Sequence, residues 1–82
     1  MLDYVGNLRT SELELRQQLS VLECYWLTGC LHAKNGVAGV TWSDEKHRLL
    51  VEYDADIFGS MELVDFLLVC GVPVASVRAG YA

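Results

Sequence analysis

One stretch constrains the fold more than any other: residues 36–54 have the pattern of two β-strands joined by a polar turn. Apolar residues alternate with others along both strands, namely Val40 and Trp42 in the first and Leu49, Val51 and Tyr53 in the second. A period of two is typical of a strand with one buried face. Residues 43–46 have the polar composition of a hairpin loop. The sequence therefore predicts a β-hairpin over Gly36–Asp54, which we expect at the centre of the sheet.

A helical pattern precedes this hairpin. Ser11 is a suitable N-cap, and Glu12 and Glu14 suit the positive end of a helix. Asn35-Gly36 suits the other end, which gives a helix of about 20 residues. Apolar residues recur at steps of three or four and predict one core-facing stripe: Leu15, Leu19, Leu22, Trp26 and Cys30.

A second helical pattern follows the hairpin. Ser60 is placed to cap a helix that runs to about Cys70, with Gly71 as its C-terminal glycine. Three residues suffice for its core face: Val64, Leu67 and Leu68. Three further apolar residues exceed that face: Leu63, Phe66 and Val69. We expect this surplus to drive self-association, through the second helix or through an exposed strand edge.

Two outer strands complete the pattern. Leu2–Leu8 is expected as a first strand and Val72–Val77 as the last, with Pro73 suiting its start or an edge. The order is then β, α, β, β, α, β. Right-handed crossovers give an α+β, ferredoxin-like βαββαβ sandwich, with a four-stranded antiparallel sheet and two helices on one face. Residues 1–82 are expected to form this single domain.

Composition excludes several classes of partner. The net charge is −5, with eleven acidic residues and six scattered basic ones, which argues against nucleic acid or an anionic membrane surface. Gly71 and Pro73 break the longest apolar run, 66–75, so no membrane insertion is expected. The N-terminus lacks the basic-then-apolar layout of a signal peptide. Three cysteines in no scaffold-like spacing indicate reduced thiols in a cytoplasmic protein.

Three short segments have a recognisable pattern: Gly36-Val37 follows the first helix, Val51-Glu52-Tyr53-Asp54 ends the third strand, and Gly71-Val72 follows the second helix. In these structural residues the chain resembles the heavy-metal-associated (HMA) domain. The resemblance implies binding of a soft metal ion, such as copper(I) or zinc, for transfer to a transporter. The family's Met-x-Cys-x-x-Cys motif is missing, because the expected loop from Gly6 to Ser11 contains no sulfur. Since soft thiolate ligands select copper(I), we expect no standard metal site there.

The other sulfur and imidazole groups are weak metal candidates. Cys24, Cys30 and His32 are close in sequence, but six residues turn the two cysteines about 120° apart on a regular helix. Cys30 also continues the predicted core stripe, so burial as a small apolar residue competes with a ligand role. Cys70 and His47 fall at the end of the sheet where the HMA family binds metal, but come from separate loops. Structural or solvent roles compete for both.

The remaining candidates have simpler interpretations. Glu52, Asp54 and Asp56 could suggest a hard-cation site, but they lack calcium-loop spacing and are expected in a solvated connection. Trp26 and Trp42 could stack a ligand, but both fall on predicted core faces. No phosphate loop, Ser/His/Asp set or paired-acid spacing is found, so an enzyme is not expected.

Two functions from different classes remain. One is a metal-handling or metal-transport accessory domain without the standard copper site, as the HMA resemblance implies. The other is a non-metal protein-interaction or regulatory module that acts as a homodimer or holds a protein partner. The surplus apolar surface favours the second, and the family resemblance favours the first.

Overall fold

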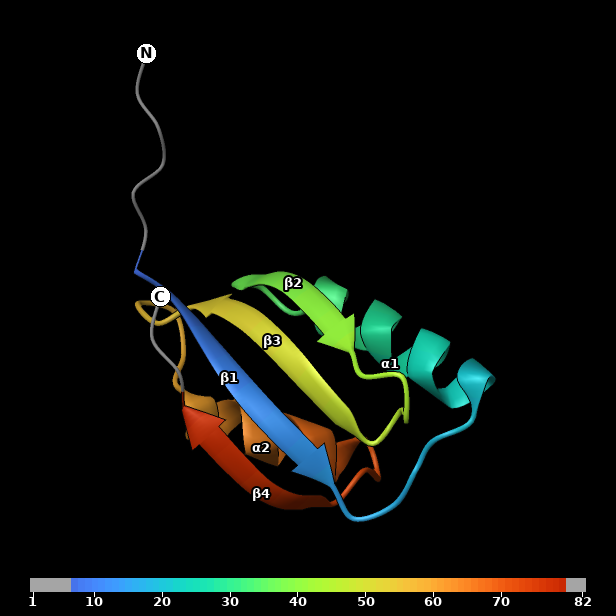
Figure 1. Cartoon of the computed structure of the whole chain (residues 1–82). Coiled ribbons are helices and arrows are strands. Elements are labelled where there is room, and N and C mark those ends of the chain that lie inside the picture. The colour runs from blue at the N-terminus through green and yellow to red at the C-terminus, as the bar shows by residue number, and fades with distance from the viewer. Residues whose placement is uncertain (1–6, 80–82) are drawn as a thin grey trace.

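The computed structural model describes residues 7–79 of the chain. Its elements are β1 (Leu8–Leu15), α1 (Val21–Ala33), β2 (Val37–Trp42), β3 (Arg48–Asp54), α2 (Ser60–Val69) and β4 (Val74–Ala79). The strands form one four-stranded antiparallel sheet in the order β2-β3-β1-β4. Both helices cover the same face of this sheet (Figure 1). The predicted ferredoxin-like fold class is confirmed.

The first strand lies later in the chain than predicted. The expected strand 2–8 falls almost entirely outside the described residues, and β1 runs over Leu8–Leu15. Ser11, expected to cap a helix, is fully buried within β1, and its hydroxyl donates to the Tyr53 hydroxyl at 3.1 Å. Alternating burial from Ser11 to Leu15 shows that a period of two prevails there over the four-residue spacing. The prediction that a helix begins at Ser11 is therefore wrong.

The true start of α1 is a capping box. The Ser20 hydroxyl accepts a hydrogen bond from the Glu23 N–H at 3.1 Å, and the Glu23 carboxylate accepts from the Ser20 N–H at 2.9 Å. These two bonds satisfy backbone donors that a helix start leaves without partners. The helix is 13 residues long, shorter than predicted. Its last turn leads to Gly36, whose φ of 101° and close approach to Phe58 admit little other than glycine.

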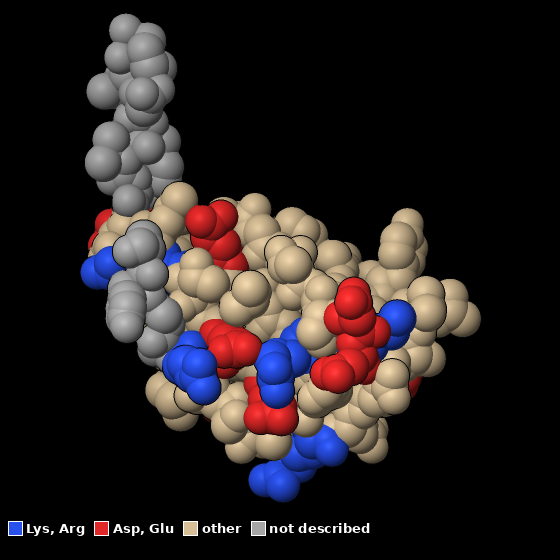
Figure 2. Space-filling view, viewed as in Figure 1, with Lys and Arg blue, Asp and Glu red and all other residues tan. Residues whose placement is uncertain are grey.

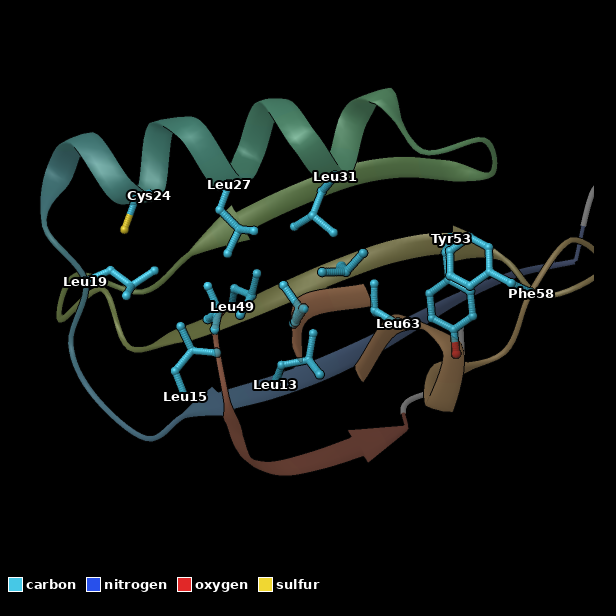
Figure 3. Close-up of a cluster of buried hydrophobic side chains, with 13 residues drawn as sticks. Leu13, Leu15, Leu19, Cys24, Leu27, Leu31, Leu49, Tyr53, Phe58 and Leu63 are labelled. Carbon is cyan, nitrogen blue, oxygen red and sulfur yellow. The ribbon is translucent and has the colours of Figure 1, made fainter. Parts of the chain in front are cut away.

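The stripe predicted to face the core does not do so. Leu15 and Leu19 are buried but precede α1, whereas Leu22 points to solvent and Trp26 is half exposed. The helix instead buries Cys24, Leu27 and Leu31, which point toward the sheet in Figure 3. Because α1 is apolar on all sides, several stripes have the right spacing, and periodicity cannot choose among them.

The predicted hairpin is confirmed, but its place in the sheet is not. β2 pairs antiparallel with β3, and the inward residues of β3 are all buried, namely Leu49, Val51 and Tyr53. However, β1 lies between β3 and β4, so β2 is an edge strand. Only one strand of the hairpin, β3, is therefore central, and the expectation that the whole hairpin forms the centre is wrong.

Helix α2 begins and ends close to the predicted residues. Gly59 is its N-cap and donates its N–H to the Glu62 carboxylate at 3.2 Å. The chain leaves the helix at Gly71, whose φ of 84° is typical of a C-terminal glycine. β4 begins two residues later than predicted, directly after Pro73.

The core face of α2 differs from the predicted one. Leu63, assigned to the surplus, is fully buried, whereas Leu68, assigned to the core, is exposed. Leu67 is buried as expected, and Val69 points to solvent as expected. A small rotation of α2 about its axis separates the predicted core face from the observed one, and packing of the helix against the sheet decides between them.

The core fills the space between the sheet and the two helices (Figure 3). Its fully buried side chains come from both layers: Leu13, Leu49 and Val51 from strands, and Leu27, Leu31, Leu63 and Leu67 from helices. At one end Tyr53 stacks on Phe58 with ring centroids 5.2 Å apart. The Lys34 ammonium lies 4.8 Å from the Phe58 ring centroid and 5.3 Å from that of Phe66, which ties the end of α1 to α2.

At the opposite end, three connections meet. In the β1–α1 loop, the Leu19 N–H donates to the Lys46 carbonyl in the hairpin turn at 3.0 Å. The Arg16 N–H donates to the Pro73 carbonyl before β4 at 3.3 Å. The loop, the hairpin turn and the segment after α2 therefore share one end of the sheet, as the topology predicts.

The face of the sheet that no helix covers carries interleaved charges (Figure 2). Arg48 on β3 lies 3.7 Å from carboxylate oxygens of both Glu12 and Glu14 on β1. Arg78 on β4 lies 3.5 Å from the other oxygen of Glu12. We call this surface the open sheet face. Across residues 7–79, neither helix has the length and apolar character needed to cross a membrane.

Candidate functional site

The sulfur and imidazole groups do not converge on one point. Within residues 7–79, no three His, Cys, Asp or Glu side chains are grouped so that they could hold a metal ion. The β1–α1 loop, residues 16–20, contains no cysteine or histidine. The donor set that a soft metal needs is therefore lacking at this loop, although the loop itself occupies the expected end of the sheet.

Cys24 lies under α1 and faces the core. It is buried, and burial raises the pKa of its thiol, with the nearby Lys46 ammonium opposing this effect. The thiol is therefore protonated at neutral pH and a poor nucleophile. Cys24 also borders an open, largely apolar groove of about 410 Å³ between the N-terminal half of α1 and the hairpin.

Cys70 and Cys30 are the two thiols that the tertiary structure brings near each other. Burial raises the pKa of the Cys70 thiol, and the neighbouring Cys30 thiol raises it further. Cys70 lines a cavity of about 140 Å³ together with Trp26, which stands one turn before Cys30 on α1. The electrostatic effect of Cys30 on Cys70 therefore acts between α1 and the end of α2, which sequence spacing does not reveal.

The two histidines have polar or exposed surroundings. His47 has its ring nitrogens 3.9 Å from a Glu14 oxygen and 3.7 Å from a Glu45 oxygen, in a polar surrounding at the end of the sheet. His32 is exposed in the last turn of α1. Cys24, Cys30 and His32, which the sequence offers only as weak candidates, are not among any group of three such side chains in residues 7–79 that could hold a metal ion.

The acidic candidates have a structural role. Asp54 is buried rather than solvated, and its carboxylate accepts a hydrogen bond from the Asp56 N–H at 2.9 Å. Its own N–H donates to the Gly36 carbonyl at 2.8 Å. Glu52 is exposed on β3. The expectation of a solvated connection is wrong for Asp54, which fixes the turn after β3.

The two tryptophans have different environments. Trp42 is half-buried against the core, and its indole N–H donates to the Thr28 hydroxyl at 2.7 Å. That hydroxyl donates in turn to the Cys24 carbonyl at 2.7 Å. Trp26 is not a core residue: 51% of it is exposed, so the prediction of packing is wrong for this residue.

The most unusual surface of the molecule is the side of α1 that faces away from the sheet. Four large apolar residues of its first two turns are exposed: Val21 (66%), Leu22 (80%), Tyr25 (81%) and Trp26 (51%). We call them, with Gly29 and Ala33 farther along, the α1 outer face. A surface helix in contact with water normally has polar residues here. Such a concentration of exposed apolar groups is uncommon on a surface that faces water.

Two further features of the α1 outer face suit a contact surface. Glu23 is the one formally charged residue of α1 at pH 7, and its carboxylate is held in the capping box. Gly29 is exposed in the helix interior, where a Cβ would meet no atom within 4 Å. Glycine at such a position costs about 1 kcal/mol of helix stability relative to alanine, and nothing within the fold requires it.

The sequence pattern concealed this face for one reason. Leu22, Trp26 and Cys30 were assigned to the core, because the helix was begun at Ser11 and its stripe extended from Leu15. The sequence does contain the correcting signal: Ser20-Val21-Leu22-Glu23 is a capping-box pattern. With the helix begun there, 13 residues with a single formal charge cannot all be buried.

Comparison with known proteins supports the fold. No family model matches the sequence, and no curated protein matches it. Among solved structures, the chain is similar to oxidised MerP from Ralstonia metallidurans CH34, with a TM-score of 0.74 and 18% sequence identity. The match covers 87% of this chain and 97% of that chain. At this identity the likeness shows the fold alone, which is the ferredoxin-like, HMA-like arrangement described above.

Proposed function

We propose that this chain is a non-enzymatic protein-interaction module of HMA-like fold, and that its contact surface is the α1 outer face. One observation carries the proposal: α1 has large apolar residues on opposite sides, but only one side packs against the sheet. Exposed aromatic side chains such as Tyr25 and Trp26 are the residues most enriched at protein contacts. Three free thiols suit action in the cytoplasm.

The charge distribution supports the same assignment. The core of a protein contact is depleted of charged residues, because each one must lose water when the partner arrives. The α1 outer face meets this condition, whereas the open sheet face carries several carboxylates and guanidinium groups. A partner with an apolar or amphipathic segment would therefore be expected on the helical side of the molecule.

A peptide selection tests the proposal, because a random library needs no candidate partner. The native protein, immobilised at low density, is exposed to a library of random peptides displayed on phage. We expect enrichment of amphipathic sequences whose binding is lost in Leu22→Glu and Tyr25→Glu. Both residues are highly exposed, so the free energy of unfolding of these variants should stay within about 0.5 kcal/mol of the native value.

Leu50→Lys is the matched control, since Leu50 is an exposed leucine on the open sheet face. Selected peptides should bind this variant as they bind the native protein. The proposal fails if no peptide is enriched. It also fails if the enriched peptides bind Leu22→Glu and Tyr25→Glu as tightly as the native chain.

Soft-metal handling is a second candidate, and it is favoured by Cys70 lining the same cavity as Trp26, one turn before Cys30 on α1. Two thiolates can hold copper(I), and the HMA resemblance implies a cargo of this kind. The expected ligands are then one sulfur from α1 and one from the end of α2, rather than the family's loop motif. This candidate concerns the side of α1 next to α2 and does not require the outer face.

Titration of the reduced protein with copper(I) or zinc(II), in competition with a chromophoric chelator, tests this candidate. Cys30→Ser and Cys70→Ser should each abolish binding, while Cys24→Ala should retain it. Equal binding by all three variants would exclude the Cys30–Cys70 pair as the site.

A further inference from the structure

We propose that the α1 outer face is occupied by the same face of a second copy of this chain, with the two α1 helices antiparallel about a two-fold axis near residue 28. This inference rests on the proposed function, since it names a partner for that face. The two can fail separately, because a monomer could still bind selected peptides.

The outer face is self-complementary in size along its length. At 100° per residue, Leu22, Trp26, Gly29 and Ala33 fall within about 60° of one another around the helix axis. The large residues occupy the N-terminal half and the small ones the C-terminal half. An antiparallel pair with its axis between residues 27 and 28 places Trp26 against Gly29 of the second copy and Leu22 against its Ala33. Each large side chain then meets a small one, twice by symmetry.

The space above Gly29 fits this arrangement. A Cβ at Gly29 would meet no atom within 4 Å, so the space above this position is open. Close approach of another backbone or an aromatic ring is a common reason for glycine in an exposed helix. The two-fold symmetry brings the half-exposed ring of Trp26 from one copy to the open space above Gly29 of the other.

Area and charge are both sufficient for a moderate dimer. The four large residues expose on the order of 500 Å² of apolar surface. A standard interface buries about 800 Å² on each partner, and two such faces together reach the roughly 1,000 Å² in total that a specific interface needs. No ammonium or carboxylate needs to be buried at the centre, because Glu23 lies on the flank of α1 in its capping box. The antiparallel helix dipoles also favour this orientation.

Mass in solution, measured from micromolar to high-micromolar concentration, tests the proposal. The native chain should show a concentration-dependent dimer, and Gly29→Glu should remain monomeric throughout. At submicromolar concentration, where both are monomers, Gly29→Glu should melt roughly 3–6 °C higher than the native chain, because it replaces a helical glycine. A variant that folds more stably and yet fails to dimerise cannot be dismissed as misfolded.

Mixing two variants tests the antiparallel geometry. An axis near residue 28 brings position 29 of one copy close to position 29 of the other. Gly29→Glu and Gly29→Lys should each be monomeric alone, and an equimolar mixture should recover dimer. Leu50→Lys, on the open sheet face, should dimerise like the native protein.

Three results would overturn the proposal. The first is a native chain that stays monomeric over the whole range. The second is a Gly29→Glu variant that dimerises as tightly as the native chain, or a mixture with Gly29→Lys that gains no dimer. The third is loss of the dimer in Val69→Glu while Gly29→Glu retains it, which would assign the interface to α2, as the sequence pattern suggests.

Discussion

The two outer surfaces of this sandwich differ in polarity. On the open sheet face, Glu12, Glu14, Arg48 and Arg78 form a lattice of ion pairs with separations of 3.5–3.7 Å (Figure 2). On the other side, the α1 outer face presents leucine, tyrosine and tryptophan. One surface of the molecule is therefore charged and hydrated, whereas the other is apolar. Since apolar surface in water is unfavourable, this difference is the basis of the proposal that contact is made on the helical side.

The comparison is most sharply tested within α1 itself. Leu27 is fully buried and Leu22 is 80% exposed, although both are leucines of one helix. Leu27→Ala should lower the free energy of unfolding by about 2–5 kcal/mol, because it leaves a cavity in the core. Leu22→Ala should change it by less than about 0.5 kcal/mol in the monomer. Denaturant unfolding at low protein concentration measures both. Similar losses of stability in the two variants would show that Leu22 is buried rather than exposed to solvent.

The covered face of the sheet should depend on individual polar contacts more than the open face does. The Ser11 hydroxyl is completely buried and donates to the Tyr53 hydroxyl. Tyr53→Phe leaves that donor unsatisfied and should cost about 1–3 kcal/mol of stability. Thermal and urea unfolding check this value. A neutral result would mean that the hydroxyl of Ser11 has another acceptor.

The start of α1 gives the next effect. Ser20→Ala removes the hydroxyl that accepts the Glu23 N–H and should cost about 1 kcal/mol. The first turn of α1, which contains Val21 and Leu22, should fray. The helix signal in circular dichroism should therefore decrease. Ser11→Ala serves as a comparison. If Ser11 were the helix cap, as the sequence suggested, Ser11→Ala rather than Ser20→Ala would lower the helix content.

The smallest effect is expected on the open sheet face. Arg48→Ala removes contacts to Glu12 and Glu14, but these groups are partly exposed and remain hydrated. The loss should be at most about 1 kcal/mol and should shrink as salt is added. Urea unfolding at low and high ionic strength measures it. A loss as large as that of Tyr53→Phe, and insensitive to salt, would break the contrast between the two faces.

Sequence periodicity was reliable where one face of an element is polar. The β2–β3 hairpin follows from its alternation, because the inward residues of β3 are apolar and the outward ones include Arg48 and Glu52. Gly71 was also assigned correctly as the end of α2, since a left-handed residue there favours glycine. These features depend on local backbone geometry, which the sequence encodes directly.

Periodicity failed where the chain is apolar on more than one side. In α1 the true core residues Cys24, Leu27 and Leu31 have the same spacing as the predicted stripe. In α2 Leu63 and Leu68 exchanged their expected roles. The proximity of Cys30 and Cys70 likewise joins two helices that are far apart in sequence.

The sequence by itself determined the order of elements, the hairpin and the overall α+β class, because turn residues and strand alternation act over a few neighbouring residues. Tertiary structure alone decided which sides of α1 and α2 are buried and that β2 is an edge strand. Those choices depend on how Leu13, Leu49 and Val51 of the sheet fit against each helix. Packing of that kind is a property of the assembled layers, and it left the apolar outer face of α1 in solvent.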